Sequence, residues 1–184
     1  GWTAEAISAV RLTRDVREAI SGDDIDVVVE ATGDPIAGAL HALAVFHAGK
    51  HLVNVNVEAD VLVGPALAQR AAQAGVVYSL AYGDQPALIA ELVDWARATG
   101  FRVAAAGKGT KYLPEYHAST PDTIWSHYGL TAEEAQAAGM NSQMFNSFLD
   151  GTKSAIEMAA VANASGLRPP DDGLAFPPVG VEDL

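Results

Sequence analysis

The fold is decided by a short stretch in the first third of the chain, Asp26-Val27-Val28-Val29-Glu30-Ala31-Thr32-Gly33-Asp34-Pro35. Its run of β-branched residues is typical of a strand buried in a parallel sheet. The turn that follows ends at Pro35, a residue type favoured in the first turn of a helix. The stretch therefore predicts a strand that passes through a tight turn into a helix ending at Gly49.

The same alternation of strand and helix extends to both sides. We expect a strand at 10–13, a helix at 14–20, strands at 51–55 and 76–81, and between these a helix at 58–74. This order implies a parallel sheet with helical crossovers, an α/β fold. We interpret residues 1–82 as the C-terminal part of a Rossmann domain, with an incomplete Rossmann-like parallel sheet.

The second half predicts a mostly helical catalytic region over residues 83–166. Its expected elements are helices at 86–99, 131–138 and 141–164, a strand at 101–106 and an aromatic-rich loop at 107–130. Residues 167–184 are rich in proline, and we expect them to be an extended linker to a further C-terminal domain.

Composition narrows the class of protein. Of the 184 residues 49% are hydrophobic, the formal net charge is -12, and there is no cysteine. The negative charge disfavours a nucleic-acid partner, and the lack of cysteine excludes disulfides and thiolate metal sites. No apolar run is long enough to cross a membrane, and the first residues show no targeting pattern. We expect a cytoplasmic protein with no metal, a small-molecule substrate and a possible homo-oligomeric state.

Ligands of open parallel sheets bind beyond the carboxyl ends of the strands. Three such ends carry small or polar residues, around Gly33, Asn54 and Gly83. Each alone is more often a simple turn or helix cap, but three adjacent ends favour a shared site. The dinucleotide motif G-x-G-x-x-G is absent. Because the chain begins in the middle of the alternation, we expect that the unit carrying this motif is missing and that this chain alone binds the cofactor weakly.

A polar stripe marks the expected helix at 141–164. Its members, spaced four, three and four residues apart, are Asn146, Asp150, Lys153 and Glu157. That spacing places them on one face, with the apolar Met144 and Phe148 expected in the core on the other. The stripe is either a solvated face with ordinary ion pairs or part of a cleft in which an Asp–Lys pair moves a proton.

Several stretches resemble known oxidoreductases. Residues 26–33 and 49–56 resemble the homoserine-dehydrogenase-like and sugar-dehydrogenase-like enzymes. A narrower resemblance, to the deoxyxylulose-phosphate-reductoisomerase-like enzymes, is carried by residues 57–61, 106–109, 150–159 and 163–167. It implies a reductase that uses NADP or NAD on a small polyol or sugar phosphate, in a step of isoprenoid synthesis. The anionic character of such a substrate is part of this expectation.

The resemblance also implies site residues. The cofactor contacts it implies are Ala31, Thr32, Gly33, Asn54 and Gly83. The catalytic residues it implies are Lys108, Asp150 and Lys153, with Glu58 and Asp60 as partners. Lys108 would hold an anionic group or polarise a carbonyl, and Lys153, set by Asp150, would transfer the proton.

Two alternatives remain open at this stage. A homoserine-type or sugar-acid dehydrogenase could use the same scaffold, although Asn56 is followed by Val57 and not by that family's catalytic lysine. A non-catalytic cofactor-binding module is the other alternative, because fold does not fix function. Burial of the polar stripe would favour an enzyme, and a solvated stripe would favour the module.

Overall fold

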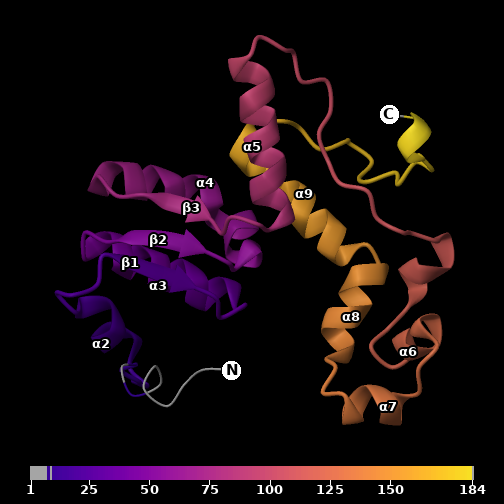
Figure 1. Ribbon diagram of the computed structural model, residues 1–184, viewed down its shortest axis with the longest axis horizontal. Coiled ribbons are helices and arrows are strands. Elements are labelled where there is room, and N and C mark those ends of the chain that lie inside the picture. The colour runs from indigo at the N-terminus through magenta and orange to yellow at the C-terminus, as the bar shows by residue number, and fades with distance from the viewer. Residues whose placement is uncertain (1–7, 9, 184) are drawn as a thin grey trace. The chain divides into compact units, whose positions relative to one another are not determined.

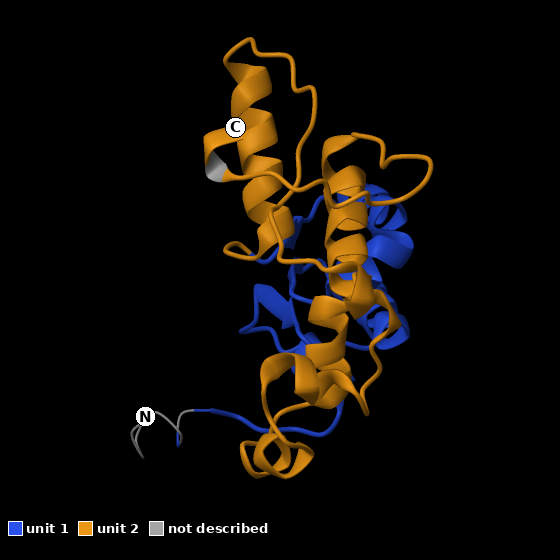
Figure 2. Cartoon of the chain, turned by 90° about the vertical axis from the view of Figure 1, so that its right-hand side faces the viewer, with its two compact units in different colours: residues 1–81 blue, residues 82–184 orange. Residues whose placement is uncertain are grey.

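The computed structural model describes residues 8 and 10–183, and the chain forms two compact units, residues 1–81 and 82–184 (Figure 2). The first unit contains a parallel sheet with helices, and the second is mostly helical. The predicted α/β fold class is therefore confirmed.

The sheet of the first unit has three parallel strands in the order β1-β2-β3 (Figure 1). They are β1 Val27–Glu30, β2 His51–Asn54 and β3 Tyr78–Leu80. The helices of this unit are α2 Val16–Ser21, α3 Pro35–His47 and α4 Val57–Ala74. The two crossover helices contact each other; α3 also contacts β1 and β2, and α4 contacts β3.

Side-chain alternation along the strands explains the core of this unit. Val28 pairs with Leu52 in the register, and both pack with α3 and α4 around the buried Phe46. Val27 and Val29 point to the other face, where they are 50% and 61% exposed. One face of the sheet is therefore covered by the two helices, as the period of two in a strand requires.

Local signals fix where the crossover helices begin. The Asp34 side chain accepts a hydrogen bond from the Ala37 N–H, and Pro35 occupies the first turn of α3. Asn56 caps α4 in the same way through the Ala59 N–H. Both caps satisfy N–H groups that a helix leaves without a partner.

The second unit is built on α5 and α9, which lie against each other. Its elements are α5 Gln85–Ala98, η1 Pro114–Ala118, α6 Ile124–Tyr128, α7 Ala132–Ala137, α8 Ser142–Leu149, α9 Thr152–Ser165 and η2 Val181–Asp183. Ile124, Trp125 and Ala135 form a small buried core, against which Phe145 of α8 packs.

Two predicted strands are wrong. Residues 10–13 and 101–106 both lie within the described part of the chain and form no strand there. Leu12 is 87% exposed and Phe101 64% exposed, so these segments are not buried as sheet strands would be. Apolar composition suggested strands, but a strand also needs a neighbour to take its backbone hydrogen bonds. The expected loop at 107–130 is likewise interrupted by η1 and α6.

The predicted single helix over 141–164 is also wrong, because the chain forms two helices, α8 and α9, with a bend between them (Figure 1). Gly151 separates them with a left-handed φ of 92°. Asp150 accepts a hydrogen bond from the Thr152 N–H at 2.8 Å and so satisfies the start of α9. A glycine in the left-handed region separates the two helices, and the aspartate before it accepts the first N–H of the second.

Candidate functional site

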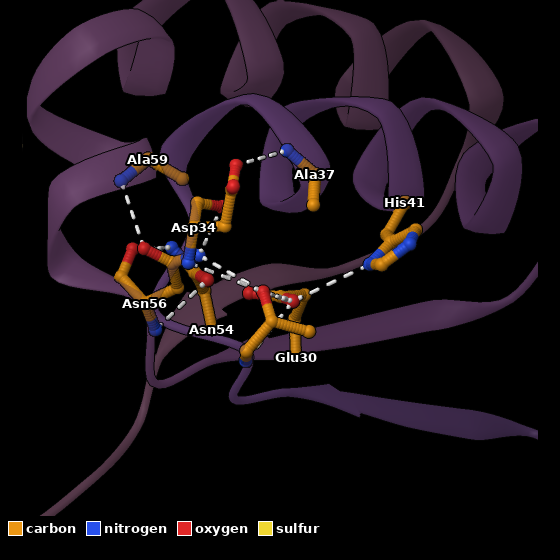
Figure 3. A network of polar contacts seen from close by, with 8 residues as sticks. Glu30, Asp34, Ala37, His41, Asn54, Asn56 and Ala59 are labelled. Carbon is orange, nitrogen blue, oxygen red and sulfur yellow. Dashed lines mark hydrogen bonds and ion pairs between the residues drawn. The ribbon is translucent and has the colours of Figure 1, made fainter. Parts of the chain in front are cut away.

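A buried polar network lies at the carboxyl ends of β1 and β2 (Figure 3). Glu30, the last residue of β1, is 3% exposed. Its Oε1 atom accepts a hydrogen bond of 2.6 Å from the Thr32 hydroxyl and lies 3.4 Å from His41 Nδ1. Burial alone would raise the pKa of Glu30, but hydrogen bonds from Thr32, Asn56 and His41 outweigh burial, so the pKa is lowered.

Two asparagines extend this network. The Asn56 side chain donates a hydrogen bond of 2.8 Å to the Asp34 carbonyl and accepts one of 3.1 Å from the Ala59 N–H. These two bonds connect the turn before α3 to the turn before α4. Asn54 donates to the Asn56 carbonyl at 3.0 Å and to the Tyr78 hydroxyl at 3.2 Å. Asn54 is 3% exposed, so the structure places this expected cofactor contact inside the protein.

The two acidic residues expected as catalytic partners occupy the first turn of α4. Asp60 is 5% exposed and accepts a hydrogen bond of 2.8 Å from the Tyr78 hydroxyl. Burial raises the pKa of Asp60, and the hydrogen bond from Tyr78 offsets only part of that effect. Glu58 is half-buried.

The open part of this edge is backbone. Ala31, Thr32 and Gly33 are exposed, and Gly33 has a φ of 73° with no atom within 4 Å of the place that a Cβ would occupy. Gly83, in the second unit, is equally open at a φ of 101°. Small residues with free space above the backbone allow a flat ligand to approach closely.

The second unit holds a cavity of about 360 Å³. It is lined by Asp84, Gln85, Lys108, Thr110, Phe148, Lys153, Ser154 and Glu157. The structure therefore brings together two of the expected catalytic residues, Lys108 and Lys153, which are far apart in the sequence. Two lysines and two carboxylates at one cavity can bind a charged substrate and move protons.

Two of the residues that line this cavity form an ion pair. Lys108 Nζ is paired with Glu157 Oε2, and the Glu157 side chain is only 3% exposed against 22% for Lys108. Glu157 belongs to the polar stripe noted in the sequence, but it was not among the expected catalytic residues. The signals for it were its spacing of four residues from Lys153 and its place in the stretch 150–159 that carries the resemblance.

Asp150 does not line the cavity. Its Oδ1 atom accepts the Thr152 N–H at 2.8 Å, and its Oδ2 atom accepts the Asn146 side-chain amide at 2.9 Å. Asp150 therefore joins the end of α8 to the start of α9.

The face of this region that we expected in the core is partly exposed. Asn146, Ser154 and Glu157 are buried, whereas Met144 and Phe148, expected in the core, are 48% and 40% exposed. The expectation of an apolar core face is wrong here, because periodicity defines faces without saying which face is covered.

Neither a membrane-spanning helix nor a metal-binding cluster is found in residues 8 and 10–183. No helix there is both long and apolar enough to cross a membrane. No three histidine, aspartate or glutamate side chains of this part of the chain group together as a metal ion would require.

A parallel α/β unit followed by a helical unit with a lysine-bearing cavity fits the class of two-part α/β oxidoreductases. Residues 83–184 match the family described as oxidoreductase DRL, catalytic domain. The match covers more than half of the chain, and the chain belongs to this family. No curated protein matches it. The prediction of an oxidoreductase is thereby confirmed, and membership implies a redox cofactor.

Proposed function

We propose that the chain is the cofactor-binding and catalytic part of a reductase that uses NADP or NAD on a small anionic polyol or sugar phosphate. The expected reaction is a reductoisomerase-type step of isoprenoid synthesis. The observation that carries the proposal is the cavity lined by Lys108 and Lys153, which lies within the family's catalytic domain.

Reduction of a carbonyl needs a hydride, a proton and a place for the substrate's own charge. A bound nicotinamide cofactor supplies the hydride, and the open backbone at Ala31, Thr32 and Gly33 supports binding of its ring. Lys108 and Lys153 can supply the proton and the counter-charge. The hydroxyl groups of Thr110 and Ser154, at the same cavity, suit a polyol.

Burial of the polar side chains favours an enzyme over a non-catalytic module. Within the polar stripe, Asn146 and Glu157 are 6% and 2% exposed, and Asp150 and Lys153 are half-buried, which a solvated binding module would not require. Burying polar groups opposes folding unless they are paired, so such groups often mark a functional site.

The test measures consumption of reduced cofactor by the complete protein, with NADPH or NADH and a panel of keto-sugar phosphates and hydroxy acids. We expect cofactor oxidation with a keto-sugar phosphate. Lys108→Met should abolish it, and Lys111→Met, which alters an exposed lysine three residues away, should not. Turnover confined to the hydroxy acids would favour the dehydrogenase alternative, and no turnover with any panel member would contradict the proposal.

A further inference from the structure

We propose that Glu157 is a positioning residue that fixes Lys108 as the proton donor. This role rests on the proposed function. It departs from the sequence-based expectation, in which Asp150 set Lys153 for proton transfer.

The ion pair between Glu157 and Lys108 is asymmetric. The carboxylate is almost fully buried on α9, and the ammonium belongs to a segment between α5 and η1 that forms neither helix nor strand. A carboxylate buried without a partner is strongly destabilising, whereas an exposed surface pair contributes little. The pairing is therefore more than a surface contact, and it holds the Lys108 head group at one place on the cavity wall.

The backbone around Lys108 is also held against α9. A Cβ placed on Gly107 would lie 3.4 Å from the Met158 sulfur, the residue that follows Glu157. Besides Glu157, the charged groups that line the cavity with Lys108 are Lys153 and Asp84. Asp84 accepts the Gln85 N–H at 2.9 Å as the cap of α5, so its charge faces a helix start.

The reduction step then balances as follows. The carbonyl carbon accepts the hydride, with its two electrons, and the carbonyl oxygen accepts a proton from Lys108 Nζ. The product is an alcohol, and Lys108 is left as a neutral amine. Because its side chain is 22% exposed, Lys108 can regain a proton from water. Glu157 keeps its charge throughout and exchanges no proton with the substrate.

The Lys108→Arg variant keeps the positive charge at this position but removes the group that can donate a proton. Arginine can pair with Glu157, but its guanidinium does not release a proton at ordinary pH. We expect kcat to fall by about 10²–10⁴-fold with KM within about threefold of wild type. Wild-type kcat in Lys108→Arg would overturn the assignment of the donor.

A double-mutant cycle tests the positioning role. Glu157→Gln should lower kcat by about 10²-fold alone and should add almost nothing to Lys108→Met, because both act through the same ammonium. Glu133→Gln, at an exposed position in α7, is the matched control. If Glu157→Gln does not fold, Glu157→Asp replaces it, with a smaller loss of kcat expected. Additive effects in the cycle would overturn the positioning role.

Lysine acetylation supplies a readout that needs no turnover. With an acetylating reagent and mass spectrometry, Lys108 should react more slowly than the exposed Lys111 in the wild type and faster in Glu157→Gln than in Glu133→Gln. Equal rates in these two variants would overturn the pairing. If the pairing is found but no panel substrate is reduced, the proposed function and the donor role fail together, and the ion pair alone stands.

Discussion

The phenol of Tyr78 donates a hydrogen bond of 2.8 Å to the Oδ1 atom of Asp60, joining β3 to the first turn of α4. Burial, and then the charge of Asp60, raise the pKa of Tyr78, so the phenol stays protonated and remains a donor. Burial also raises the pKa of Asp60 in spite of this bond. The two residues form a buried polar link, and its burial disfavours the ionised form of the Asp60 carboxyl group.

We expect Asp60→Asn to stabilise the protein at neutral pH. Because the pKa of Asp60 is raised in the folded state, the protonated Asp60 stabilises the folded protein. This stabilisation is present below the unfolded pKa and is lost as pH rises through the folded pKa. Asparagine carries no charge and can still accept from Tyr78. Urea unfolding from about pH 3 to pH 7 should show the variant's advantage growing with pH. An advantage that is the same at every pH would contradict this explanation.

Glu30→Gln should have the opposite sign, and it serves as the matched comparison in the same unit. The pKa of Glu30 is lowered, so its contribution to stability is present above the unfolded pKa and is lost as pH falls through the folded pKa. We expect the variant to lose about 1–3 kcal/mol at neutral pH, because a buried acceptor of hydrogen bonds is weakened. The loss should shrink as pH falls below about 4. A variant as stable as wild type at pH 7 would show that the network does not depend on the charge.

Gly38 gives a third prediction, because it is buried in α3 where that helix approaches the polar network. A Cβ there would lie 2.6 Å from Asn56 Nδ2 and 3.0 Å from Ala59 Cβ. Alanine would gain helix propensity of about 1 kcal/mol, but overpacking should outweigh it and leave a net loss of about 1–3 kcal/mol. Thermal unfolding measures this, with Gly109→Ala as the control, since no atom lies within 4 Å of its Cβ position. A Gly38→Ala variant more stable than wild type would show that the neighbours move aside at little cost.

The parts of the fold that sequence could predict are those decided locally. β1 and α3 follow from a valine run, an aspartate cap and Pro35, all within about one turn of each other. The expected strands at 10–13 and 101–106 failed because strand formation depends on a partner elsewhere in the chain, which local composition does not report. The break at Gly151 had a local signal, an Asp–Gly pair, but the regular spacing across it suggested one helix.

The candidate site shows the same limit. The sequence identified Lys108 and Lys153 as residues of interest, but their meeting at one cavity depends on how residues 101–113 lie against α9. The pairing of Lys108 with Glu157 is a long-range contact that spacing cannot predict. Helical periodicity placed Glu157 on the face of Lys153 and left open whether that face was buried.

Asp150 gives the last prediction, which separates a structural from a catalytic carboxylate. Both of its oxygens serve helix ends, one accepting from the Thr152 N–H and the other from the Asn146 amide. Asp150→Asn can keep the first bond, and the second can re-form if Asn146 turns its amide, whose Oδ1 atom is buried with no hydrogen-bond partner among the described residues. We therefore expect kcat within about threefold of wild type and little change in melting temperature. Asp150→Ala, which removes both side-chain hydrogen bonds, should lose about 0.5–1.5 kcal/mol of stability for each bond. If Asp150 instead set Lys153 for proton transfer, Asp150→Asn would lower kcat by about 10²-fold or more in a protein of unchanged stability. Steady-state kinetics and thermal unfolding of the two variants side by side distinguish these outcomes, and a large loss of kcat in a stable Asp150→Asn protein would return proton transfer to the Asp150–Lys153 pair.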